Sequence, residues 1–165
     1  MIRSVNLNYA DEICEIYNYY VQNTIITFEE KIVTPDEMTE RIRDITKELP
    51  WLVFIENKTI VGYAFASKWK SRCAYRRAVE STIYLLPNAE GRGIGTRLYT
   101  KLLNILQKKN YHAVIGGIAL PNEKSIALHE KLGFGKVAHF KEVGLKFGKW
   151  IDVGYWELIF AKSDK

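Results

Sequence analysis

Gly91, Gly93 and Gly95 are the residues of this sequence whose type and spacing point most directly to a ligand. They follow an apolar run at 81–86 and precede an amphipathic segment that begins at Thr96. Glycine lets a backbone approach a ligand closely and adopt positive φ. A helix that begins just after such a turn directs its free N–H groups and its positive dipole end at an anion. The glycine loop therefore predicts a phosphate-binding site.

Two nucleotide-binding interpretations of this loop fail on spacing. A P-loop ends in Gly-Lys-Ser/Thr, whereas this loop ends in Gly95-Thr96-Arg97. A dinucleotide-binding loop has the pattern G-x-G-x-x-G after the first strand and an acidic residue about 20 positions further on. Here the spacing is G-x-G-x-G, the loop follows roughly the fourth strand, and 113–118 is wholly apolar and glycine.

A second group of polar residues lies further along the chain. Asn122, Ser125 and His129 have offsets of 0, +3 and +7. At about 100° per residue they fall within roughly 60° of each other on one helix face. Such a polar stripe can line a cofactor groove, and the alternative is a solvated helix face.

The surrounding pattern predicts the elements that position these residues. Helices are predicted over 9–21, 34–49, 96–109 and 122–132, and Thr34-Pro35-Asp36-Glu37 offers a capping box at the start of the second. Strands are predicted over 2–5, 51–56, 60–68, 79–86, 113–118, 136–143 and 150–160. The order β-α-α-β-β-β-α-β-α-β-β predicts an α/β fold, with a mixed sheet and helices on its faces.

Composition fits one globular domain. A chain of 165 residues, 47% apolar and 26% charged, is expected to form a single domain over 1–165. Neither a membrane span nor a signal peptide is recognisable, so we expect a cytoplasmic protein. Cys14 and Cys73 are too few for a disulfide framework and lack metal-ligand spacing, which predicts reduced thiols and no metal. The net charge of +5 suits an anionic ligand, but no nucleic-acid-binding pattern accompanies it.

The glycine loop and the polar stripe together resemble the GNAT superfamily of acetyltransferases. Glu90-Gly91-Arg92-Gly93-Ile94-Gly95 is similar to its Gln/Arg-x-x-Gly-x-Gly/Ala signature and matches at both glycines. Asn122-Glu123-Lys124-Ser125-Ile126-Ala127-Leu128-His129-Glu130-Lys131-Leu132-Gly133-Phe134 resembles its N-x-x-S-x-x-x-Y-E-x-x-G-F segment. Glu90 departs from the signature. Its carboxylate would repel a pyrophosphate, so we expect its side chain to point to water.

This resemblance implies acetyl-CoA as the co-substrate and assigns residues to it. The implied contacts are Ile83, Tyr84, Leu85, Asn122 and Ser125 along the pantetheine arm, and Gly91, Arg92, Gly93, Ile94, Gly95 and Thr96 at the pyrophosphate. His129 stands where many relatives carry Tyr as general acid. The resemblance therefore implies that His129 protonates the departing thiolate, the alternative being that it only packs or binds.

Further segments resemble a narrower family, the phosphinothricin N-acetyltransferases and the related methionine sulfoximine/sulfone acetyltransferases. They include 50–53, 62–64, 69–76, 79–84 and 143–154, so the resemblance covers essentially the whole chain. It implies an N-acetyltransferase that acts on the α-amino group of a small amino acid or analogue, and it implies a homodimer.

In that family Glu80 matches the proposed catalytic glutamate. An amine must be neutral to attack a thioester, so a base is needed. Glu80 would serve if burial raises its pKa or if a water relays the proton. Arg76 would share a face with Glu80 on a regular strand and could hold a substrate carboxylate, with Phe28, Tyr75 and Phe147 as apolar walls. The alternative for Glu80 is an ion pair with Arg76 or Arg77 on the surface.

Other functions remain open at this level. A protein or peptide N-terminal acetyltransferase would need an open groove. The aromatic tail hairpin instead predicts a closed or dimer-covered pocket; its aromatic residues are Phe147, Trp150, Tyr155 and Trp156. A non-catalytic acyl-CoA-binding module would bind CoA without acetylating an amine, and a nucleic-acid binder would show steep salt dependence. An acyl-enzyme on Cys73 is not expected, because nothing near it in sequence marks an activated thiol.

Overall fold

The computed structural model describes residues 1–161. Their elements are, in order, β1 (Ile2–Ser4), α1 (Ala10–Asn23), α2 (Pro35–Thr46), β2 (Trp51–Glu56), β3 (Thr59–Lys68), β4 (Ala78–Leu85), α3 (Ile94–Lys108), β5 (Ala113–Ala119), α4 (Glu123–Lys131), β6 (Gly135–Lys146) and β7 (Lys149–Ile159). Short 3-10 turns lie at Leu7–Tyr9, Cys73–Tyr75 and Pro87–Ala89. The predicted order of elements and the predicted α/β class with a mixed sheet are confirmed.

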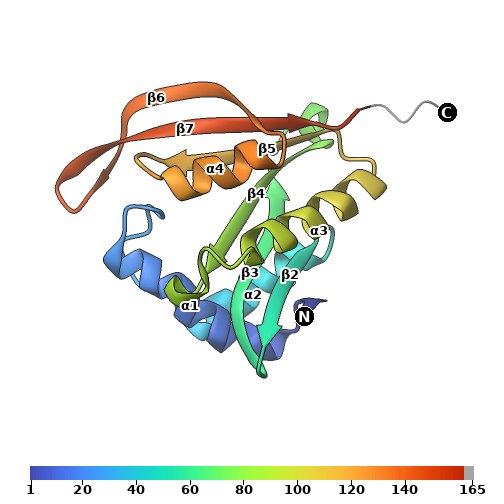
Figure 1. The fold of residues 1–165 in the computed structure, drawn as a ribbon, viewed down its shortest axis with the longest axis vertical. Coiled ribbons are helices and arrows are strands. Elements are labelled where there is room, and N and C mark those ends of the chain that lie inside the picture. Colours follow the sequence, from blue (N-terminus) through green and yellow to red (C-terminus); the bar gives the residue numbers. More distant parts are fainter. Residues whose placement is uncertain (162–165) are drawn as a thin grey trace.

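One sheet joins all seven strands in the order β1-β2-β3-β4-β5-β7-β6 (Figure 1). Every neighbouring pair is antiparallel except β4 and β5, which are parallel and connected through α3. A parallel pair needs such a crossover because its strands begin at the same end of the sheet. The glycine loop lies at the start of this crossover.

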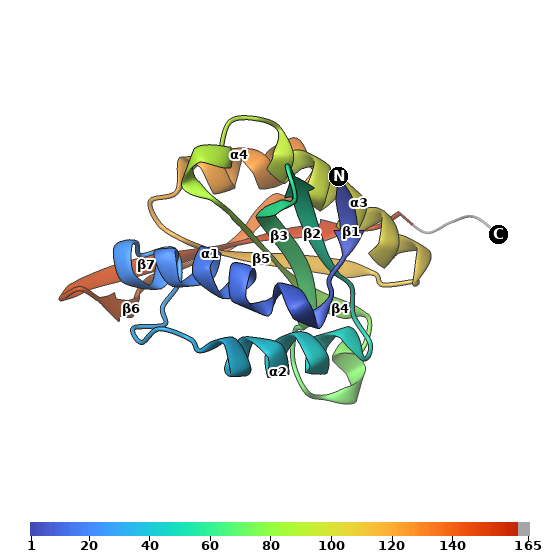
Figure 2. The same cartoon turned by 90° about the horizontal axis from the view of Figure 1, so that it is seen from below.

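Helices cover both faces of the sheet, with α1 and α2 on one side and α3 and α4 on the other (Figure 2). On the α3 side, Leu98, Leu102 and Leu106 are fully buried at helical spacing. The opposite core contains Ile13 and Met38, from α1 and α2. Among the described residues, no helix has both the length and the apolar character that a membrane crossing needs.

Several boundaries differ from the sequence expectation for local reasons. The capping box of α2 is present, with Thr34 and Glu37 bonded reciprocally, but the helix ends at Thr46 and the chain turns before Leu49. α3 begins at Ile94, two residues earlier than expected, because Gly93 in the left-handed region ends the loop. β6 continues past Val143 to Lys146, since a bulge before Gly144 interrupts the alternation that sequence patterns detect.

Candidate active site

The parallel strands β4 and β5 pair only where they begin. Their ladder joins 78–80 to 113–115, although the strands run on to Leu85 and Ala119. Beyond that ladder the two strands diverge (Figure 1). A cavity of about 340 Å³ lies there. Its lining consists of 80–84 of β4, 117–119 of β5, two residues of α4 with the N-cap Asn122, loop residues 26–28, and Tyr99, Val143, Val153 and Tyr155.

The edge of β4 that faces this cavity is available to a ligand. From Ser81 to Leu85 the strand pairs with β3 on its other edge only. A free strand edge can hydrogen-bond an extended, amide-bearing molecule as a further strand would. At its far end the carbonyl of Leu85 already accepts a hydrogen bond of 2.6 Å from the Tyr20 hydroxyl.

Glu80 lies in the cavity where the strands part. Burial raises the pKa of its carboxyl group. None of the ion pairs among the described residues includes Glu80. A Cβ at Gly117 would lie 3.4 Å from Glu80 Oε1 and 3.1 Å from Tyr155 Cε1, so the glycine keeps the space beside the carboxylate open. A half-buried carboxylate with a raised pKa suits a general base.

His129 is buried and belongs to a hydrogen-bonded chain. Its Nδ1 lies 2.7 Å from the carbonyl oxygen of Ser125, and its Nε2 lies 3.0 Å from the Tyr99 hydroxyl. Since a carbonyl only accepts, Nδ1 carries the proton in the neutral ring and Nε2 is the acceptor. Burial lowers the pKa of His129, and the bond to Ser125 opposes that shift.

Tyr99 extends this chain to the cavity. Its hydroxyl lies 3.0 Å from Ser81 Oγ as well as from His129 Nε2, and its one proton can serve either neighbour. Tyr99 and Ser81 line the cavity together with His129. Burial raises the pKa of Tyr99 well above its usual range, so the hydroxyl is protonated at neutral pH and can pass a proton on only as it takes another up.

The glycine loop has the backbone geometry of an anion site. Gly91 has φ 71° and Gly93 has φ 76°, and a Cβ at either position would meet nothing within 4 Å. Gly93 is the N-cap of α3 and offers no side-chain cap, so the first N–H groups of the helix remain free for a ligand. Gly95 packs between Ile83 of β4 and Leu128 of α4, which places the loop at the end of the parted strands.

Two acidic residues hold the charged side chains beside this loop. Glu90 forms an ion pair with Lys124 of α4, rather than pointing freely to water as expected from the sequence. The Glu90 carboxylate raises the pKa of Lys124. Arg92 donates two hydrogen bonds, of 2.8 and 2.7 Å, to Glu56 at the end of β2. The lysine thus offsets the negative charge that Glu90 brings to a phosphate site.

Seven of the predicted site residues line this one cavity, Glu80 among them. Asn122, Ser125 and His129 line the cavity from α4, and Ile83, Tyr84 and Phe28 line it from other elements. Asn122 also caps α4, since its side chain accepts a hydrogen bond of 3.1 Å from the amide of Ser125. Its capping role fixes the start of the helix that carries the stripe.

Tyr75 and Arg76 are placed elsewhere. They line a second cavity, of about 220 Å³, with Cys73 and Lys70 rather than with Glu80. The prediction that Arg76 and Glu80 share a strand face is wrong, because β4 begins only at Ala78 and Arg76 ends a 3-10 turn. There its guanidinium donates to the carbonyl oxygen of Cys73 at 3.2 Å.

Several cavity residues are not predicted from the sequence, among them Tyr99, Tyr155 and Thr27. Tyr99 does not stand out in the sequence, because Leu98 and Leu102 give the segment the pattern of an apolar helix face. Tyr155 belongs to the aromatic tail in the sequence, and Thr27 lies in a loop without a recognisable pattern. The one indication for Tyr99 is its hydroxyl on an otherwise aliphatic helix face, since a buried tyrosine needs a hydrogen-bond partner for its O–H.

With this geometry in place, the chain can be assigned to a class. Residues 2–154 match the acetyltransferase (GNAT) domain, and the protein belongs to that family. It is 39% identical over 147 residues to a phosphinothricin N-acetyltransferase of Streptomyces coelicolor, covering 87% of this chain and 86% of the relative.

Two further relatives agree with that assignment. The L-methionine sulfoximine/L-methionine sulfone acetyltransferase of Salmonella typhimurium is 32% identical, over 93% of this chain and 94% of its own. A crystal structure of a phosphinothricin acetyltransferase from Sinorhizobium meliloti in complex with AcCoA superposes with a TM-score of 0.95 at 34% identity, over 99% of this chain and 90% of that one. The resemblance inferred from the sequence motifs is confirmed.

Proposed function

We propose that this protein transfers the acetyl group of acetyl-CoA to the α-amino group of a small amino acid or analogue, of the phosphinothricin or methionine sulfoximine/sulfone type. The observation that carries the proposal is Glu80, a half-buried carboxylate with a raised pKa in the cavity between β4 and β5. The named activities of the relatives above supply the acceptor class.

The residues present fit acetyl-CoA. The free N–H groups after Gly93 suit a pyrophosphate, and the open glycine positions let a backbone reach it. The unpaired edge of β4 suits the amides of a pantetheine arm, with Asn122 and Ser125 on the opposite wall. When bound, acetyl-CoA supplies the acetyl group as a reactive thioester.

The proton transfers divide between two walls of the cavity. Glu80 takes one proton from the substrate ammonium, which frees the amine to form the new N–C bond as the C–S bond breaks. The amine loses a second proton when it becomes an amide. The Tyr99 hydroxyl, which lies 3.0 Å from His129 Nε2, gives its proton to the departing thiolate and takes up the one that the amine loses, so Glu80 and the thiol end with one proton each. A thiol is a good leaving group and needs little further help.

The surroundings of the cavity favour a small acceptor. Phe28 lines one side of it and Val143 of β6 another, so a loop and a hairpin both border the acceptor end. A protein N-terminus or a nucleic acid would need an open groove there. Of the residues expected around the acceptor, Phe28 is retained. Tyr75 and Arg76 are left out because they line the second cavity, and Phe147 is left out because it is exposed and lines neither cavity.

We extend the proposal to assembly and location. Six exposed apolar residues on β6, β7 and their turn support a homodimer: Val137, Phe140, Val143, Leu145, Phe147 and Trp150. Two free cysteines support a cytoplasmic location, where thiols stay reduced. One sheet that joins strands from β1 to β7 supports a single domain.

The test is a panel of amino acids and analogues, including phosphinothricin and methionine sulfone, assayed for acetyl-CoA-dependent thiol release. We expect at least one to be N-acetylated and Glu80→Gln to slow its kcat/KM by about 10²–10⁴-fold. Because a base must be deprotonated, wild-type kcat/KM should fall as the pH falls through the raised pKa of Glu80. The variant should lack that decline. Turnover by Glu80→Gln equal to wild type at every pH would remove Glu80 from this role.

A further inference from the structure

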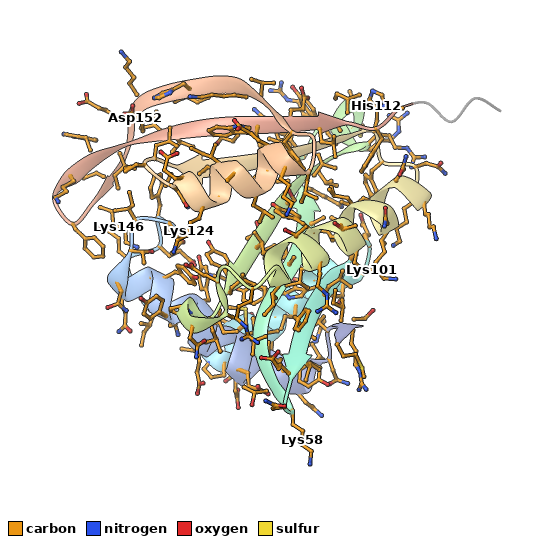
Figure 3. All side chains as sticks on the ribbon, in the orientation of Figure 1. Lys58, Lys101, His112, Lys124, Lys146 and Asp152 are labelled. Carbon is orange, nitrogen blue, oxygen red and sulfur yellow. The ribbon has the colours of Figure 1, made fainter. Side chains whose placement is uncertain are left out.

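Lys146 is a charged residue buried where the reaction does not use it. It lies at the end of β6, beside the turn to β7 (Figure 3), and only 1% of its surface is exposed. Burying an ammonium group is unfavourable unless specific contacts compensate it. Its Nζ donates a hydrogen bond of 2.7 Å to the backbone carbonyl of Thr27, in the loop between α1 and α2.

That loop forms one wall of the cavity. Residues 24–34 contain neither helix nor strand, yet Ile26, Thr27 and Phe28 line the cavity. Without regular secondary structure, such a segment depends on its tertiary contacts for a fixed position. The carbonyl that Lys146 holds therefore belongs to the middle of the wall.

A second contact joins the same two segments. Gly144, two residues before Lys146 on the same face of β6, packs against the Phe28 ring. A Cβ at Gly144 would lie 2.4 Å from Phe28 Cζ, so only glycine leaves room for the ring. The Thr27 hydroxyl meanwhile lies 2.8 Å from the Tyr17 hydroxyl, which fixes the other side of the loop to α1.

We propose that Lys146 is a positioning residue for the acceptor, because it clasps the 24–34 loop to the β6–β7 hairpin and so fixes Thr27 and Phe28 in the cavity wall. This inference rests on the proposed function for its kinetic consequence. The donor residues, by contrast, lie on β4, α3 and α4, outside the two segments that the clasp joins. Loss of the ammonium group should therefore affect the acceptor and spare the donor.

The experiment compares Lys146→Met with Lys149→Met, an exposed lysine that pairs with it across the turn. We expect Lys146→Met to raise the acceptor KM about tenfold or more, through misplacement of the wall. The KM for acetyl-CoA should stay within about twofold, and the control should match wild type. In a Phe28→Ala background the same substitution should raise the acceptor KM much less, since the ring that it positions has already been removed. Equal losses for donor and acceptor, or full additivity with Phe28→Ala, would overturn the positioning role.

Hydrogen exchange separates this inference from the proposed function. Amides of 24–34 should exchange faster in Lys146→Met than in wild type or Lys149→Met, while those of α3 stay unchanged. Unchanged exchange in the loop would refute the clasp even in an active enzyme. Faster exchange in a protein that acetylates no member of the panel would support the clasp and count against the acceptor assignment alone.

Discussion

At the scale of single residues, charge and burial decide what each functional group can do. The sequence contains nineteen acidic residues, and no sequence pattern shows that the pKa of Glu80 is raised. Its raised pKa comes from desolvation between two strands and an α4 helix that the chain reaches much later. Glu90 shows the reverse case. Within the glycine loop its carboxylate would repel a phosphate, but Lys124 pairs with it and offsets its negative charge.

The Glu90–Lys124 pair gives a prediction about donor binding. Replacing Glu90 by Gln removes a negative charge near the pyrophosphate site and frees Lys124, so CoA should bind about two- to fivefold more tightly. Lys124→Gln leaves Glu90 unopposed and should weaken binding by a similar factor. Both changes should shrink at high salt. Isothermal titration with CoA measures them.

The matched control for that pair is Lys131→Gln at the other end of α4, which should leave the CoA affinity unchanged. If Glu90→Gln weakened CoA binding, Glu90 would be a direct donor contact and the offset of its charge by Lys124 would be wrong.

At the scale of elements, the site depends on where β4 and β5 stop pairing. Their apolar sequences predict two strands, and both strands form. Neither sequence shows that the ladder ends after Glu80 and Ile115. Where the two strands part, two adjacent glycines of β5 leave space for different side chains. Gly116 makes room for the His129 ring, and Gly117 makes room beside Glu80 and Tyr155.

Substitution of these two glycines by alanine should have different effects, one mainly on stability and the other mainly on activity. A Cβ at position 116 would lie 2.4 Å from His129 Nε2, so Gly116→Ala should destabilise the fold by about 1–3 kcal/mol. At position 117 the tightest contact is 3.1 Å, to Tyr155, so Gly117→Ala should cost less than about 1 kcal/mol but reduce kcat/KM by crowding Glu80. Urea denaturation and steady-state kinetics measure the two effects. A Gly117→Ala enzyme with wild-type kcat/KM would show that this space is not needed for catalysis.

At the scale of the whole molecule, the β6–β7 hairpin has two roles. Its inner face holds the 24–34 loop through Lys146 and Gly144. Between Val137 and Trp150, six of its exposed side chains are apolar, and Trp150 alone is 63% exposed. An apolar surface of this extent marks an interaction site. A second copy of the chain is the partner we propose.

The homodimer proposal predicts a solution mass of twice 19.1 kDa by light scattering. Leu145→Asp places a charge in the apolar hairpin surface and should shift the protein to the monomer, because burying an unpaired carboxylate is unfavourable. Tyr19→Asp, at an exposed position on α1, is the control and should remain dimeric. A wild-type monomer at micromolar concentration would refute the proposal.

The sequence by itself determined the order of elements, the capping box of α2, the glycine loop and the polar stripe of α4. These features arise from local periodicity, local backbone conformation and short motifs, which neighbouring residues specify. Only the tertiary structure decided the protonation of Glu80, the partner of Glu90, the role of Tyr99, the exclusion of Arg76 from the Glu80 cavity and the clasp at Lys146. Each of these depends on contacts between segments far apart in the chain or on where a strand begins, and local patterns do not encode those distances.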